Sequence, residues 1–335
     1  MRERLLLDEG ELTHRLSQNL QILLRHQKQT WDVLRRNYED LDAVETRSLS
    51  IGNSTVHLQH NPARLTSTSA RVDEESIRSR PCFLCLENLP EVQRGLAYGD
   101  EFVILCNPFP IFPEHFTIVH RRHTPQRFEP VMRTFVELSR ELGEEYVVLY
   151  NGPRCGASAP DHLHLQVGNS GFLPLEDEYE RMIMQGGEKI ADKEGVVAFG
   201  VEEGGRRFLA IESDDIDDVR AAIRAAFVAL DGGHAASDEP MVNILSWFRE
   251  GEWRVVLFPR AKHRPECFDA PEERRLVISP AAVDLSGVVI APRRSDFERI
   301  TAHDVAAIFV EVLLSPEAFS RFKEEYTKQF YALRG

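Results

Sequence analysis

The segment from His162 to Val167, with the sequence HLHLQV, alternates strictly between polar and apolar side chains. Strict alternation predicts a β-strand, because successive side chains of a strand point to opposite faces of its sheet. One face would carry the three apolar residues, and the other would carry His162, His164 and Gln166 about 7 Å apart. A strand with a polar face toward solvent would show the same alternation. Other segments of the chain must therefore decide whether this polar face is a site.

Apolar runs and helical spacings around this segment predict an α+β fold. A helix is expected over residues 128–142, where apolar side chains recur at steps of three and four. Strands are expected at residues 102–106, 115–119 and 146–150. This order predicts a sheet covered by helices on one face. Further strands are expected in RFLAIE, MVNILSWF and WRVVLFPR, and further helices near residues 217–230, 301–313 and 316–333.

The chain divides by composition into three predicted parts. Residues 1–75 form an N-terminal helix and substrate-loop arm: the first 42 residues have helical spacing, and residues 48–80 are polar and predict an irregular loop. Residues 76–185 form the predicted catalytic domain, and residues 195–335 form a second α+β half. Two similar halves are suggested by the faint echo of TIVHRRHTPQ from the first half in VVLFPRAKHRP of the second.

The boundary between these two halves is predicted at residues 186–205, which are rich in glycine and charge. The 335-residue chain has a formal net charge of −14. Such a charge argues against nucleic acid and anionic membranes as partners, since both attract basic surfaces. Any phosphate-bearing ligand must therefore meet local basic groups. The sequence shows neither a signal-peptide core nor a membrane-spanning run, which predicts a cytoplasmic location.

Five cysteines are too few, and odd in number, for a disulfide framework. Cys82 and Cys85 form a Cys-x-x-Cys pair, which in a cytoplasmic chain indicates metal binding or redox chemistry. A buried turn with two hydrophobic thiols is the alternative. A tetrahedral zinc site needs two further ligands, and His123 and His162 complete a four-ligand set. Such a closed set predicts a structural Zn²⁺, because it leaves no position for water.

The loop before the alternating segment also points to a ligand. It begins at Asn151 and contains the small residues Gly156 and Ser158, whose exposed N–H groups could cradle a phosphate. A phosphate-binding loop directly before two histidines favours a site over a solvent-facing strand. It also makes Asn151, Gly156 and Ser158 candidates for binding substrate.

On these motifs the chain resembles the histidine-triad superfamily, in its transferase branch with His-x-His-x-Gln. The run GASAPDHLHLQ is similar to the family's phosphate loop and catalytic strand, although Asp161 is an extra residue before the first histidine. His115, His120 and His123 occupy the positions of a second histidine-rich run of the family. In zinc-bearing members the last of these positions is a ligand. The resemblance implies an antiparallel sheet with packed helices, two such halves and an N-terminal helical arm.

Within the superfamily, the GDP-hexose phosphorylases of the GDP-L-galactose type are similar over the longest span. The shared segments include residues 59–64, 125–127, 162–166, 257–260 and 313–326. The cysteine pair is a departure from these enzymes and is similar to the uridylyltransferases. This coverage implies that both halves of the chain belong to one enzyme.

The resemblance implies that His164 attacks the α-phosphorus of a nucleoside diphosphate sugar, and that Gln166 stabilises the developing charge. A sugar 1-phosphate would leave, and inorganic phosphate would be the acceptor. Arg64 is the expected source of positive charge, with Arg154 and Arg260 as weaker candidates. The alternatives are a dinucleoside polyphosphate phosphorylase, a hexose-1-phosphate uridylyltransferase, and a non-catalytic zinc-stabilised protein that binds nucleotide sugars. A homodimer is one option for its assembly, and base and sugar stay open.

Overall fold

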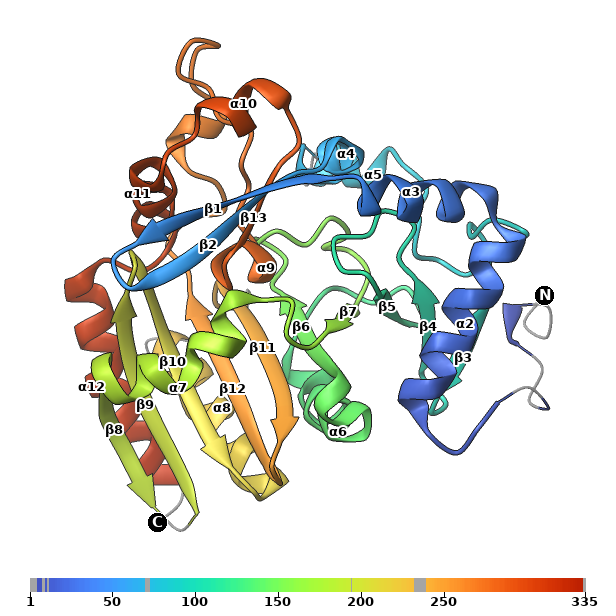
Figure 1. Cartoon of the computed structure of the whole chain (residues 1–335). Helices are drawn as coiled ribbons and strands as arrows, with labels where there is room; N and C mark the ends of the chain where they lie inside the picture. The colour runs from blue at the N-terminus through green and yellow to red at the C-terminus, as the bar shows by residue number, and fades with distance from the viewer. Residues whose placement is uncertain are drawn as a thin grey trace.

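The computed structural model describes residues 5–7, 10, 12–69, 73–193, 195–231 and 239–333. Its centre is one ten-stranded sheet in the order β3-β4-β5-β7-β6-β11-β12-β10-β9-β8 (Figure 1). All neighbouring strands of this sheet are antiparallel. The strands are β3 (Gly95–Tyr98), β4 (Phe102–Cys106), β5 (His115–His120), β6 (Tyr146–Asn151), β7 (His164–Asn169), β8 (Gly187–Lys193), β9 (Val196–Glu203), β10 (Arg206–Ser213), β11 (Val242–Arg249) and β12 (Glu252–Pro259).

The sheet consists of two halves with the same strand order. From each outer edge inward, the first three strands follow the chain order and the last two are exchanged. The halves meet where β6 pairs with β11, in a register that places Asn151 opposite Asn243. The expected duplication is therefore present in the topology. The sequence echo does not mark equivalent strands, because it compares β5 with β12, which hold different places in the order.

Helices cover both faces of the sheet, so the prediction of one covered face is wrong. Strand alternation explains why: along β6, Val148 and Tyr150 join one core cluster while Val147 and Leu149 join the other. The first core includes α2 (Leu16–Thr30), α3 (Asp32–Asp42), α6 (Met132–Leu142), α8 (Ile216–Asp231) and α12 (Pro316–Leu333). The second includes α7 (Pro174–Gly186), α9 (Ala282–Leu285), α10 (Arg294–Arg299) and α11 (Ala302–Val312).

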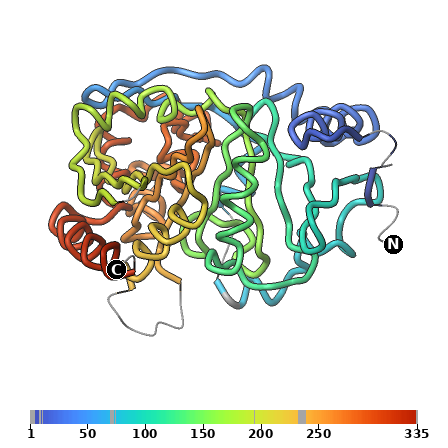
Figure 2. Tube along the Cα trace, turned by 90° about the horizontal axis from the view of Figure 1, so that it is seen from below, coloured from blue at the N-terminus to red at the C-terminus, as the bar shows by residue number. Residues whose placement is uncertain are grey.

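The N-terminal arm is only partly as predicted. Helical structure is present in α2 and α3, but residues 45–60 form a hairpin where an irregular loop was expected. Its strands are β1 (Glu45–Ile51) and β2 (Ser54–His60), and β2 pairs in parallel with β13 (Val288–Ala291). Figures 1 and 2 show this blue segment crossing from the first half of the molecule to the second. It leads into the short helices α4 (Leu65–Thr68) and α5 (Glu74–Arg78).

Within the predicted boundary segment, residues 187–193 and 196–203 form the hairpin of β8 and β9 at the outer edge of the second half. The three-part division of the chain stays a prediction. None of the five cysteines, all of which lie among the described residues, takes part in a disulfide. In the part of the chain that the structure describes, no helix combines the length and apolarity needed to span a bilayer.

Candidate active site

The start of β7 is held in place by one buried amide, that of Gln126. The backbone N–H of His164 donates to Gln126 Oε1 over 2.8 Å. The Nε2 of Gln126 in turn donates to the carbonyl oxygens of Asn151 (2.9 Å) and His164 (3.0 Å). A side-chain amide that meets three backbone groups in the interior fixes their relative positions, because leaving any of them unpaired would be costly. Gln126 therefore joins the ends of β6 and β7.

The His164 ring has a defined tautomer. Its Nδ1 lies 2.8 Å from the carbonyl oxygen of His162, which can only accept, so Nδ1 carries the proton. The other nitrogen, Nε2, then keeps its lone pair. Burial lowers the pKa of His164 to about 4, and the residue is only 4% exposed. At neutral pH the ring is an uncharged imidazole with a nucleophilic nitrogen.

The Gln166 amide is oriented by a second buried histidine, His115. The backbone N–H of Ile111 donates to His115 Nδ1 over 3.1 Å, so the ring proton lies on Nε2. This Nε2 donates to Gln166 Oε1 over 2.9 Å. Burial, together with the positive charge of Arg64, lowers the pKa of His115 to about 3, which keeps it uncharged. With its oxygen engaged, Gln166 is left with its NH₂ group as a hydrogen-bond donor.

A pocket brings together the four residues that were expected to bind substrate: Arg64, Asn151, Gly156 and Ser158. Gln166 lines it as well, whereas His164 lies two residues earlier on the same strand face. The hollow measures about 690 Å³ with its open mouth included, and little of it is enclosed. The enclosed part has a volume of about 60 Å³, well below the roughly 300–1,000 Å³ of pockets that enclose small ligands, so a nucleotide would lie mainly in the open part of the hollow.

The second half of the chain supplies part of the pocket wall, through His263, Arg264, Ser279 and Asp284. The two halves approach closely at Gly156, where the φ angle is 93° and a Cβ would lie 2.6 Å from Ala281 Cβ. Glycine is required there both for its backbone conformation and for space. The loop that contains Gly156 is thus fitted closely against the second half.

The expected arginines have different environments. Arg64 donates to the carbonyl oxygen of Phe109 over 2.8 Å, and burial lowers its pKa to about 10, so it stays cationic at neutral pH. Arg260 is buried and donates to backbone carbonyls and to Asn243 Oδ1, which makes it a structural residue. Arg154 does not line the pocket, and its Nη2 lies 3.4 Å from the Glu239 carbonyl oxygen.

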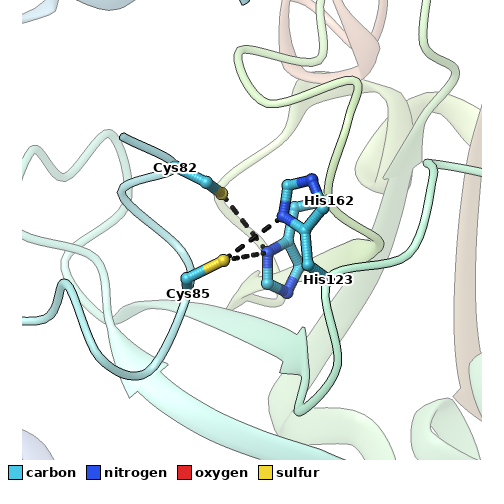
Figure 3. Close-up of side chains that lie close together, drawn as sticks. All are labelled: Cys82, Cys85, His123 and His162. Atoms are coloured by element: carbon cyan, nitrogen blue, oxygen red, sulfur yellow. Dashed lines mark hydrogen bonds between the residues drawn. The ribbon is translucent and has the colours of Figure 1, made fainter. Parts of the chain in front are cut away.

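Cys82, Cys85, His123 and His162 converge as expected for metal ligands, with their ligand atoms within 4.8 Å of one another (Figure 3). The Nδ1 of His162 lies 3.3 Å from Cys82 Sγ and 3.6 Å from Cys85 Sγ, and the Nδ1 of His123 lies 3.2 Å from Cys85 Sγ. In tetrahedral zinc sites, bond lengths of 2.3 and 2.0 Å place sulfur and nitrogen about 3.6 Å apart. Thiol–imidazole hydrogen bonds could have similar lengths, but four converging donors suit a metal. The cluster can therefore hold a metal ion.

Two family models match the sequence. One is described as a domain of unknown function (DUF4922) and matches residues 23–169, and the other is described as a GDPGP1-like C-terminal domain and matches residues 203–332. No curated protein matches the chain significantly. The galt-like protein of Arabidopsis thaliana has a TM-score of 0.39 and 13% identity, over 81% of this chain and 99% of that one.

The yeast Ap4A phosphorylase Apa2 is more similar, with a TM-score of 0.54 and 18% identity over 84% of this chain and 94% of that chain. The structure of yeast Apa2 in complex with Ap4A has a TM-score of 0.52 and 16% sequence identity, over 84% of this chain and 97% of that chain. This similarity extends over both halves of the sheet. The chain has a histidine-triad fold. The fold class predicted from the sequence is confirmed.

In this histidine-triad fold, His162 lies just before β7 and connects the cysteine–histidine cluster to His164. Its side chain belongs to the metal-binding cluster, and its Nε2 donates to the His120 carbonyl over 2.7 Å. Its own carbonyl accepts the Nδ1 proton of His164. The expectation that both histidines face one site is therefore wrong, since β7 begins only at His164. The extra residue Asp161 pairs with Arg80 over 3.3 Å and stands 3.7 Å from His123 Nε2.

Four residues of this site had no role predicted from the sequence: His115, Gln126, His263 and Arg264. The first two lie in segments that carry the resemblance to the histidine-triad fold, and that was the available signal. His263 and Arg264 follow the strand WRVVLFPR, whose end points at the pocket only after the two halves have joined. No local pattern distinguishes them from solvated residues.

Proposed function

We propose that the protein is a nucleotidyltransferase of the phosphorylase type that acts on a nucleoside diphosphate sugar, a GDP-hexose above all. The observation that carries the proposal is the fixed tautomer of His164, which leaves a nucleophilic Nε2 on the strand whose Gln166 lines a pocket together with Arg64. The sequence resemblance to GDP-hexose phosphorylases and the match to a GDPGP1-like domain support this substrate class.

The reaction has two displacements at the α-phosphorus. In the first, the lone pair of His164 Nε2 forms a bond to phosphorus, and the bridging P–O bond breaks with its electrons on the departing sugar 1-phosphate. In the second, an oxygen of inorganic phosphate attacks, and the P–N bond breaks with its electrons returning to Nε2. The products are sugar 1-phosphate and nucleoside diphosphate. Because the leaving group is a stabilised phosphate anion, a strong general acid is not needed.

The pocket residues have separate roles in this proposal. Arg64 offsets the charge of the phosphates, and the backbone at Gly156 and Ser158 donates to phosphoryl oxygens. Asn151 lines the pocket, while its Oδ1 accepts from Asn243 Nδ2 (2.7 Å) and from the backbone N–H of Ala282 (2.9 Å). It therefore holds the pocket wall and leaves its own NH₂ group as the donor.

We also propose that Cys82, Cys85, His123 and His162 hold a structural Zn²⁺. Two thiolates and two neutral imidazoles are a typical closed set for this ion, and zinc in such a site contributes folding energy and no reaction step. The hydrogen bond from His162 Nε2 to the His120 carbonyl would orient the ring as a ligand. Because His162 also positions His164, the zinc site would support the nucleophile indirectly.

A phosphorolysis screen tests the proposed activity. GDP-, UDP- and ADP-hexoses and diadenosine tetraphosphate are each incubated with the protein, with and without phosphate, and the nucleoside diphosphate formed is measured. We expect phosphate-dependent conversion of a GDP-hexose to GDP and hexose 1-phosphate. Consumption of diadenosine tetraphosphate alone would identify a dinucleoside polyphosphate phosphorylase. Conversion of a UDP-hexose only with a hexose 1-phosphate acceptor would identify a uridylyltransferase, and intact ligands throughout would indicate a binding protein.

Replacing Gln166 by arginine is expected to slow formation of the nucleotidyl-enzyme by roughly 10²–10³-fold, which is the typical cost of losing one donor to the transition state. The guanidinium would hold phosphate in the ground state as well, which does not lower the barrier. Single-turnover kinetics with a GDP-hexose measures the rate, and nucleotide affinity measured in parallel should not fall. An unchanged single-turnover rate would remove Gln166 from the catalytic site.

A further inference from the structure

We propose that His263 and Arg264 of the second half form, with Arg64, a subsite for a second phosphoryl group of the ligand. This subsite would hold the β-phosphate of the nucleoside diphosphate sugar and, after the sugar 1-phosphate has left, the attacking inorganic phosphate. The inference rests on the proposed function for the second of these roles. For the first role it requires only that a nucleoside diphosphate binds in the pocket.

The backbone at this position is held rigidly by Arg260. Its buried guanidinium donates to the carbonyls of Lys262 (2.9 Å) and His263 (3.0 Å), and also to those of Pro280 (2.9 Å) and Val312 (3.1 Å). The backbone directly before Arg264 is therefore fixed to this buried guanidinium. A preorganised backbone is what a ligand-binding position requires, since little ordering is left to occur on binding.

The side chain of Arg264 bridges two walls of the pocket. Its Nε donates to Ser279 Oγ over 3.2 Å, its Nη2 donates to the carbonyl of Thr68 over 3.0 Å, and its guanidinium lies 4.1 Å from the centre of the Phe268 ring. Thr68 belongs to α4, in the N-terminal arm, whereas Ser279 and Phe268 belong to the second half. Arg264 thus presents a fixed planar cation at the pocket wall, the form of side chain best suited to phosphate.

The charge of the pocket is suited to an anion, in contrast to that of the chain. Among the lining residues, Arg64 and Arg264 are cationic and Asp284 is the single acid. The carboxylate of Asp284 is already engaged, because it accepts the backbone N–H groups of Ala281 (2.9 Å) and Ile290 (3.0 Å). His263, which burial keeps uncharged by lowering its pKa to about 4, can offer a neutral N–H donor. Two arginines in a chain of net charge −14 are a local concentration of positive charge.

One subsite serves both steps because of the direction of displacement. Attack by His164 expels the leaving phosphate on the side of the α-phosphorus away from the ring, in line with the forming bond. The incoming phosphate must approach from this same side to expel the histidine. The groups that bound the β-phosphate therefore meet the acceptor, and the second half of the chain becomes part of the reaction site.

Binding of GDP and GMP to the wild-type protein and to Arg264→Gln tests the subsite by calorimetry. We expect the variant to bind GDP roughly 10- to 100-fold more weakly, the usual effect of losing a charged donor, while GMP affinity changes less than about 3-fold. Inorganic phosphate should compete with GDP more strongly than with GMP. Arg154→Gln removes a nearby charge outside the pocket and is the matched control, with both affinities unchanged. UDP/UMP and ADP/AMP pairs are measured in parallel.

The ratio of the two affinities separates a phosphate contact from a structural role. A variant that merely loosens the pocket would lose GMP and GDP affinity equally, and this outcome would overturn the subsite. Arg264→Lys, which keeps the charge, should recover part of the discrimination. A wild-type protein that binds GDP no better than GMP would also overturn it, even with turnover present. Intact discrimination without turnover of any nucleotide sugar would instead overturn the proposed function and leave the subsite standing.

Discussion

Replacing His164 by alanine is expected to lower nucleotidyl transfer by roughly 10⁴-fold or more, since a double displacement cannot proceed without its nucleophile. The fold should survive, because the ring makes one hydrogen bond, to the His162 carbonyl, worth about 1 kcal/mol. Trapping of radiolabelled nucleotidyl-enzyme after acid quench measures the first step directly. His164→Gly with added imidazole should regain part of the rate, because free imidazole can occupy the space of the side chain and supply the nitrogen.

The control for this variant is His57→Ala, which removes a histidine on β2 that bonds to Ser48 and does not line the pocket. Its activity should match the wild type. Activity of His164→Ala within tenfold of the wild type would show that another group attacks phosphorus. Loss of activity together with loss of the cooperative thermal transition would point to a folding defect, and the imidazole experiment with His164→Gly then decides, since a misfolded protein is not rescued.

The parts of the fold that could be predicted are those whose signals are local. Alternation from His162 to Val167 and the apolar run of β6 determine their strands without reference to distant residues. The hairpins β1–β2 and β8–β9 were missed for a physical reason. β1 and β8 are edge strands with mostly exposed or half-exposed side chains, so selection for polar and charged residues gives them the composition of loops.

The candidate site shows the same division between local and distant signals. The convergence of Cys82 and Cys85 in a cluster that can hold a metal is predictable because their spacing is a local property, and the shared strand of His164 and Gln166 because its alternation is local. The contribution of Arg264 depends on contacts between residues far apart in the chain, such as its bond to Thr68 and the anchoring of Arg260 by Asn243. A single arginine in a sequence is usually solvated. Only the joined halves indicate that this one faces a pocket.

Replacing Cys82 by serine is expected to remove zinc from the purified protein and to lower its melting temperature by about 10 °C, since losing a structural metal costs more than about 4 kcal/mol. The cluster holds together three separate segments, which begin at Cys82, at His123 and at His162. Metal binding to such a site is coupled to folding, so zinc content and stability should fall together. Elemental analysis and thermal unfolding measure the two quantities, with Cys267→Ser, at a half-buried thiol outside the cluster, as the control.

Loss of the metal should also disturb His164, because His162 contacts both the cluster and the His164 ring. The backbone carbonyl of His162 fixes the proton on His164 Nδ1, and its side chain is one of the four expected ligands. When the ligand set is broken, His162 can shift, and the hydrogen bond that orients the His164 ring is weakened. Nucleotidyl-enzyme formation per folded molecule should therefore fall in Cys82→Ser and stay unchanged in Cys267→Ser. A different result would be a wild-type protein that lacks zinc at about one per chain and has the same melting temperature as Cys82→Ser. It would show that the cluster is a set of hydrogen-bonded thiols and imidazoles.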